Sequence, residues 1–197
     1  MTSDHPVRVQ IRQTTTYARV QVIIRLVLLL AIGTVGSSSL YWLLYLALPA
    51  LVGIVVTQKG GDRYLAEDAP RIVRLLRWLV GAYAYLWLVT DALPTAGAGG
   101  AVDLDVATDA GPTVTSSLAR LLYSFPALIV AIILSLAAGL LWLVGAAAVL
   151  ITQRMPAAIS DFLAMTLRYQ TRLFAYHVSL VDRYPSLEDT SPQEAPM

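Results

Sequence analysis

The chain of 197 residues contains no cysteine and few charged residues of either sign. The missing cysteine excludes disulfides, thiolate nucleophiles and cysteine metal ligands together. Charged residues make up 14% of the chain and the formal net charge is +1, so the sequence offers no basic footprint for nucleic acid. No Ser-His-Asp set, carboxylate pair or phosphate-binding loop is visible. We therefore expect a protein that is not an enzyme and that binds no cofactor or metal.

The sequence instead contains long segments without charged residues. Hydrophobic residues make up 57% of the chain, and the segments Leu40–Thr57 and Pro126–Thr152 contain no charged residue at all. The second segment is longer than the ~20 residues that cross the hydrocarbon core of a bilayer. The composition therefore predicts an all-α integral membrane protein.

The chain also carries a diverged copy of itself. Arg77–Pro94 and Arg168–Pro185 align without a gap at a spacing of 91 residues, with Arg, Tyr, Asp and Pro at matching positions. Upstream, the segments from Arg25 to Gln58 and from Arg120 to Gln153 align at a spacing of 95. The four-residue difference falls in the loop that follows each upstream segment, where insertions are tolerated. These matches predict two tandem repeats of one membrane module.

This organisation divides the chain into five parts. They are a basic N-terminal tail at 1–16, membrane repeat 1 at 17–94, a Gly/Ala/Asp linker at 95–113, membrane repeat 2 at 114–185 and a disordered acidic tail at 186–197. Basic residues favour the cytoplasm for the N-terminal tail and for the segment that follows each apolar run. The linker has no Lys or Arg, which favours the outside. We expect it in the cytoplasm, because two hairpins would place the three basic segments on one side and acidic residues count little in this rule.

Each repeat begins with an apolar segment that fits a transmembrane hairpin or one long kinked helix. A straight helix as long as the segment from Arg25 to Gln58 would reach ~50 Å, well beyond the ~30 Å hydrocarbon core of a bilayer. In repeat 1, Gly33–Ser39 is rich in Gly and Ser and predicts the turn of a hairpin. Repeat 2 offers only Ser135–Gly139 at the matching place, so both arrangements stay open there.

The second part of each repeat is amphipathic. Between Asp161 and Asp182, apolar residues recur at helical spacing opposite a polar stripe that includes Arg168 and Arg172. This pattern predicts a helix on the membrane surface, with both arginines toward water or headgroups. His177 lies on the same helix, where we expect an interfacial side chain rather than a metal ligand or proton relay.

The segment Arg120–Leu187 resembles the DUF4389 family of bacterial membrane proteins. The resemblance is carried by Pro126, by the pairs Asp161-Phe162 and Ala175-Tyr176, and by the closing motif Asp182-Arg183-Tyr184-Pro185. The family is a domain of unknown function, so the resemblance implies an architecture and no activity. It also implies a multi-pass protein of the bacterial cytoplasmic membrane.

Polar residues near the predicted membrane surface are the candidates for contacts with lipid headgroups or a partner. They are Arg77, Arg168, Arg172, Asp182, Arg183 and Tyr184. For Asp182 we also expect a structural role at a helix end, paired with an arginine such as Arg154 or Arg172. Arg25 and Arg120 open the apolar runs, and we expect both to extend toward lipid phosphate rather than to be buried.

Small residues in the long apolar run predict a seam for helix packing. We assign this seam to Gly139, Gly145 and Ala148, because small side chains let helices approach closely. The sequence therefore favours a non-enzymatic membrane scaffold or accessory subunit that packs against itself or a larger membrane protein complex. The alternative is a small transporter, channel or lipid-handling protein. The expected partners are the bilayer and a membrane protein or second copy, without nucleic acid.

Overall fold

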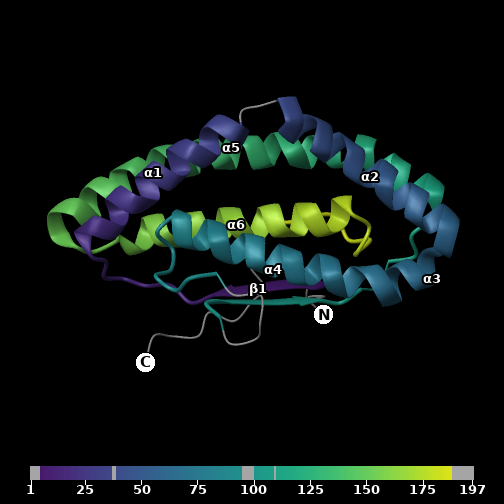
Figure 1. Cartoon of the computed structure of the whole chain (residues 1–197), viewed down its shortest axis with the longest axis horizontal. Coiled ribbons are helices and arrows are strands. Elements are labelled where there is room, and N and C mark those ends of the chain that lie inside the picture. The colour runs from purple at the N-terminus through teal and green to yellow at the C-terminus, as the bar shows by residue number, and fades with distance from the viewer. Residues whose placement is uncertain (1–4, 37–38, 95–99, 109, 188–197) are drawn as a thin grey trace.

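The computed structural model describes residues 5–36, 39–94, 100–108 and 110–187. The described part of the chain is mostly helical and has two layers, an arch of long helices above a base of helices and strands (Figure 1). The predicted helical character is therefore confirmed, although the chain is not entirely α-helical. The predicted disorder of 186–197 concerns residues that, from 188 onward, lie outside this description.

Three helices form the arch: α1 (Arg19–Gly36), α2 (Ser39–Lys59) and α5 (Val114–Thr152). Figure 1 shows α1 and α2 following one another along the length of α5. They run antiparallel to α5, as two hydrogen bonds show. Arg19, at the start of α1, donates to the carbonyl of Ile151 near the end of α5, and Tyr45 in α2 donates to Ser124 nearer its start. The predicted hairpin in repeat 1 is therefore wrong. Each helix packs against part of α5 instead of folding back on the other.

The helix α5 is continuous over 39 residues, so repeat 2 contains the single long helix and not the hairpin. It begins at a capping box in which Thr113 and Ser116 each accept a hydrogen bond from the other's backbone N–H. It ends at Gln153, whose left-handed conformation turns the chain toward the base. Pro126 lies inside α5 and removes one N–H from its hydrogen-bond ladder, which allows the helix to bend.

The base contains two helices side by side and a small sheet (Figure 1). The helices are α4 (Ala69–Leu86) and α6 (Ala157–His177), and the short turns α3 (Gly61–Arg63) and η1 (Tyr64–Asp68, a π-helical turn) connect α2 to α4. The strands are β1 (Val7–Ile11) and β2 (Val102–Val106). Most of the buried core lies between the arch and this base.

The sheet is antiparallel, with Val9 opposite Leu104. Its apolar residues face the helices, whereas Arg8, Asp103 and Asp105 are exposed. This alternation is the usual pattern of a sheet with one face on the core and one in water. The N-terminal tail at 1–16 and the linker at 95–113 thus each contribute a strand that the sequence interpretation missed.

The helix α6 does not lie on a surface as the sequence predicted. It is packed between α5 and the strands, and residues on most of its sides are buried, including Leu163, Ala175 and Arg172. Within the polar stripe that suggested headgroup contact, Arg168 meets the sheet and donates a hydrogen bond to the carbonyl of Val9 at 3.2 Å, and Arg172 is buried. The periodicity was correct, but another part of the chain occupies the polar side.

Among the described residues, α5 is the one helix whose length and composition would let it cross a membrane. Only a small part of its apolar surface is buried within the protein. This helix is compatible with the predicted association with a membrane.

Candidate functional site

Arg120 forms a buried cluster beneath the arch. It is 4% exposed, and its Nη1 donates hydrogen bonds to the carbonyls of Tyr176 at 2.7 Å and Val181 at 2.6 Å. Its Nη2 donates to the carboxylate of Asp182, and its guanidinium carbon lies 4.7 Å from the ring centroid of Tyr176. The positive charge is therefore balanced by a carboxylate, two carbonyls and an aromatic face.

Arg25 forms a second cluster with the same kinds of partner. It is fully buried, with Nη1 donating to the carbonyl of Thr90 at 3.2 Å and Nη2 donating to Asp91 at 2.6 Å. Its guanidinium carbon lies 3.9 Å from the centroid of the Tyr85 ring. Arg25, Tyr85, Thr90 and Asp91 stand where the aligned second segment has Arg120, Tyr176, Val181 and Asp182.

The ends of α4 and α6 aim the acceptor groups at these arginines. Leu88 and Ser179 adopt left-handed conformations with φ of 59° and 58°, which are uncommon for residues with a side chain. After each, the chain turns back, so that Val89 donates to the carbonyl of Ala84 at 2.9 Å. At the end of α6, Leu180 and Ala175 form the same bond at 2.9 Å. Each arginine thus lies at the partially negative C-terminal end of a helix.

The burial of both arginines overturns the expectation that they extend toward lipid phosphate. Asp182 also pairs with Arg120, a partner that the sequence did not predict. The sequence did contain a signal for this pairing, since an arginine at the start of the apolar run and an aspartate after the amphipathic helix occur in both aligned segments. Because Arg25 and Arg120 stand in apolar segments, the sequence favoured an extension toward lipid over this pairing.

Arg77 and Arg168 contact the sheet. Arg77 donates to the carbonyl of Leu104 at 2.8 Å, and Arg168 donates to the carbonyl of Val9 at 3.2 Å. Val9 and Leu104 are direct partners across the two strands. These two arginines therefore fasten α4 to β2 and α6 to β1, and their donor groups point into the protein.

The remaining candidate contacts surround the chain that follows α6. Arg172 is only 2% exposed and donates to the carbonyl of Ser186 at 2.9 Å. Tyr184 is 44% exposed and meets the ring of Tyr176 edge-on at 5.6 Å. Arg183 and the carboxylate of Asp182 are exposed as well. The structure therefore leaves Asp182, Arg183 and Tyr184 accessible to a partner, whereas Arg172 is enclosed.

The three residues of the predicted packing seam occupy different environments. A side chain at Gly139 would meet nothing within 4 Å, because this glycine faces outward. A Cβ at Gly145 would lie 2.8 Å from the Met155 side chain and 3.3 Å from Ile159, so this glycine packs inside the protein. Ala148 is half-buried. Only Gly145 therefore meets a neighbouring segment closely within the chain.

His177 is completely buried where α6 meets the arch. Its Nε2 donates to the carbonyl of Tyr45 at 2.8 Å, and its Nδ1 lies 3.0 Å from the hydroxyl of Ser124. Because the carbonyl can only accept, the neutral ring carries its proton on Nε2 and accepts from Ser124. Burial lowers the pKa of His177 from the usual 6.5, and the nearby positive charge of Arg120 lowers it further.

The buried ring of His177 predicts a loss of stability in mild acid. The unfolded chain binds the proton more readily than the folded chain, so the contribution of His177 is complete above pH 6.5 and declines as the pH falls below it. Thermal unfolding in detergent, followed by circular dichroism from pH about 7.5 to about 5, should show this decline.

The control is the His177→Gln variant, which keeps an N–H donor without a titrating ring. Its stability should decline less over the same pH range. Equal declines in the two proteins would contradict the prediction. Burial also lowers the pKa of His5, and His5 is present in both proteins. It therefore contributes equally to the loss of stability in each.

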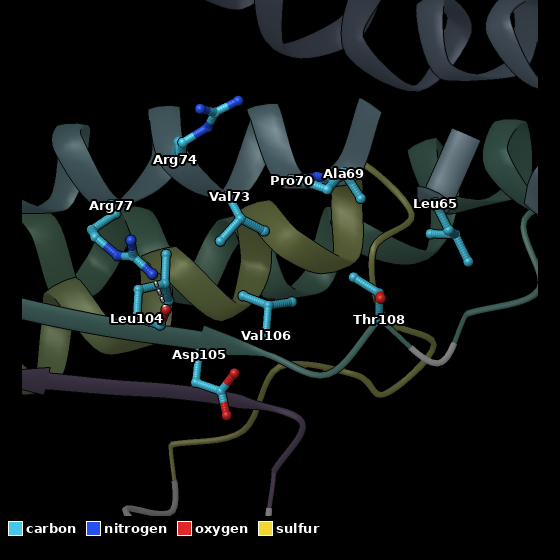
Figure 2. Close-up of a pocket in the computed structure, with 10 residues that line it drawn as sticks. All are labelled: Leu65, Ala69, Pro70, Val73, Arg74, Arg77, Leu104, Asp105, Val106 and Thr108. Carbon is cyan, nitrogen blue, oxygen red and sulfur yellow. Dashed lines mark hydrogen bonds between the residues drawn. The ribbon is translucent and has the colours of Figure 1, made fainter. Parts of the chain in front are cut away.

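A groove of about 370 Å³ lies between α4, the preceding turn and β2 (Figure 2). Leu65, Val73 and Val106 give it an apolar lining. Figure 2 shows the Arg77 side chain directed at Leu104, to which it donates, while Arg74 points away from the groove. The groove thus offers an apolar wall and no convergent set of polar groups. Among the described residues, no three His, Asp or Glu side chains are grouped to hold a metal ion.

The fold and these clusters define a mostly helical protein in which long apolar helices cover a base stabilised by two pairs of a buried arginine and a partly exposed aspartate. Residues 115–187 match the family model of DUF4389, a domain of unknown function. The predicted resemblance is thereby confirmed. No curated protein matches the chain. No solved structure matches it either.

Proposed function

We propose that the protein is a non-enzymatic membrane scaffold or accessory subunit that is held in the membrane by its arch and packs against itself or a larger membrane protein complex. The observation that carries this proposal is the exposed apolar surface of the arch. Large apolar side chains project outward along its length, among them Ile23, Ile24, Val27, Leu46, Leu51, Ile54, Leu122, Leu136, Leu140, Leu143 and Ile151. Soluble monomers rarely expose apolar patches that large.

The charges of the arch support the same proposal. Its three helices contain four charged residues, of which Arg19 and Lys59 lie at helix ends. The other two, Arg25 and Arg120, are buried against the base and paired. A transporter of ions or polar solutes needs ionisable groups along an accessible path, and these two guanidinium groups have structural partners. A scaffold is therefore favoured over a small transporter or channel.

We further infer that the two halves of the chain are diverged copies. The buried arginine–aspartate pairs support this inference, as do the left-handed residues after α4 and α6. The strands support it too, because β1 and β2 begin 95 residues apart, the spacing of the upstream segments. The copies would then begin before their apolar helices, with strand 7–11 in one and strand 102–106 in the other.

The location that we propose is a bacterial cytoplasmic membrane, which rests on the family resemblance and the apolar arch. The sequence predicts several crossings of that membrane. The positions of the helix ends favour insertion from one side instead.

Photo-crosslinking in living cells tests the scaffold proposal. A photoreactive phenylalanine analogue at Arg183 or Tyr184, which are exposed in the segment after α6, should form discrete crosslinks to a second copy or another membrane protein. The same analogue at Gln10, on the outer face of the sheet, is the matched control and should not. The absence of discrete protein crosslinks from both Arg183 and Tyr184 would contradict the scaffold while leaving the membrane placement intact.

A further inference from the structure

We propose that the arch enters the lipid bilayer from one side and returns to that side, so that the protein is embedded in the membrane without crossing it. The occupants of the outer face of the arch are then lipid acyl chains. This inference rests on the proposed membrane placement and adds its topology.

Both ends of α5 are fastened to the base. Just before the helix begins, Gly111 donates a backbone hydrogen bond to Asp182 at 3.2 Å. Just after it ends, Met155 donates to the carbonyl of Thr15 at 3.0 Å, and Gln153 accepts from Tyr17 at 3.0 Å. The helix therefore leaves the base at its first residue and meets the base again at its last.

Of the other two helices of the arch, α1 starts at the base and α2 ends at the base (Figure 1). Before α1, the hydroxyl of Tyr17 donates to the carbonyl of Leu88 at 2.8 Å. At the end of α2, the ammonium group of Lys59 lies 3.1 Å from the carboxylate of Asp68, the residue that precedes α4. Every segment that joins the arch to the rest of the described chain is thus on one side of it.

The sheet prevents these segments from lying on opposite sides of a bilayer. Residues 7–11 pair with residues 102–106 along their whole length, so both strands must be on the same side. Their outer face presents Arg8, directly opposite Asp105. Charged groups in the hydrocarbon core are costly, and this face must therefore be in water. The membrane lies on the opposite face of the protein, over the arch.

The length of α5 fits this arrangement. A helix of 39 residues is ~58 Å long, about twice the ~30 Å core, and a single crossing would leave apolar turns in water. If α5 enters the bilayer and returns to the same side, its whole length is accommodated. Because the legs of the arch are inclined, the top of the arch reaches less deeply than one leg is long (Figure 1).

Charge complementarity with lipid headgroups supports a bilayer as the occupant. Exposed basic residues flank the ends of the arch, with Arg19 and Arg154 at one end and Arg63 and Arg71 at the other. Between them, the described part of the arch exposes large apolar side chains such as Leu46, Ile133 and Leu136. Basic side chains next to an apolar face match the phosphate layer above the acyl chains, as in other proteins that lie in one face of a membrane.

The natural absence of cysteine permits a direct test on the full chain. Single cysteines at Gln10, Asp62, Asp103 and Ala158 report on the base near both ends of the arch, and cysteines at Leu136 and Leu140 report on the arch. A maleimide that cannot cross membranes is applied to right-side-out and to inverted native membrane vesicles. We expect all four base cysteines to react in one type of vesicle only, and the arch cysteines in neither. Reaction of any two base cysteines from opposite sides would overturn the proposal.

A second measurement identifies what covers the arch. Nitroxide labels at Leu136 and Leu140, in vesicles of phosphatidylethanolamine and phosphatidylglycerol, should be accessible to oxygen and protected from a water-soluble nickel chelate. A bismaleimide that joins two copies through these cysteines in high yield, together with low oxygen accessibility, would assign the surface to a second copy and overturn the lipid proposal. Release of the protein from membranes by alkaline carbonate would instead contradict the membrane placement itself, so the two failures are distinguishable.

Discussion

Replacing Arg120 with methionine should lower the free energy of unfolding by about 3 kcal/mol or more. The change removes a buried charge and the Arg120 donor of the Val181 carbonyl, and it leaves the Tyr176 carbonyl with the backbone N–H of Ser179. Each buried acceptor that loses its partner costs about 1–3 kcal/mol. Asp182 is partly exposed, so water can solvate its carboxylate after the change. Thermal unfolding in detergent, monitored by circular dichroism, measures the loss.

The matched control is Arg71→Met. Arg71 is 72% exposed and lies 3.8 Å from Asp68, so its loss should cost less than about 1 kcal/mol. The Arg25→Met variant should resemble Arg120→Met, because its partners are of the same kinds. Unchanged stability of Arg120→Met would contradict a structural role for this cluster. A large loss for Arg120→Met with none for Arg25→Met would weaken the inference of two copies.

The Gly145→Leu variant should also be destabilised, by about 2 kcal/mol, because excess volume in a packed interior typically costs about 1–3 kcal/mol. The first carbon of the new side chain would already lie 2.8 Å from Met155, and the rest of the isobutyl group must displace that residue or Ile159. Since Met155 is flexible, it can move partly aside and the fold survives. Thermal unfolding and migration on a native gel both report the change.

Gly139→Leu is the control on the same helix. Nothing lies within 4 Å of a Cβ at Gly139, so this variant should unfold at the temperature of the original protein. If Gly139→Leu instead disrupts a complex on a native gel without lowering the unfolding temperature, Gly139 faces a partner. Equal stability of both leucine variants would show that the close approach at Gly145 is unimportant.

The sequence predicted the helical character and the positions of the main helices, because apolar composition and helical periodicity are local properties. It placed the break in repeat 1 next to Ser39, where α2 begins. The sequence analysis did not predict the two strands. The segments 7–11 and 102–106 each alternate apolar and polar residues, but each is only five residues long. Such strands are stable only when paired and covered, and their partners are distant in the chain.

The candidate site was predicted in part. Aligning the two segments drew attention to Asp182 and to its counterpart Asp91. It did not reveal Arg120 as the partner, because an arginine in an apolar run normally extends to the membrane surface. Burial became favourable here through carbonyls aimed by the helix ends, a feature of tertiary structure. For Arg168, the polar stripe was recognised, but the carbonyl of Val9 that it meets comes from the other end of the chain.

The pairing of β1 with β2 has a consequence for biosynthesis. Ile11 leaves the ribosome long before Val102, its partner in the sheet. During that interval the edge of β1 is unpaired, and α1 and α2 have no α5 to pack against. An open strand edge can pair with another chain, and two half-made molecules can exchange equivalent halves. The long separation between partners also slows folding, so this largely helical protein should complete its structure later than its helix content suggests.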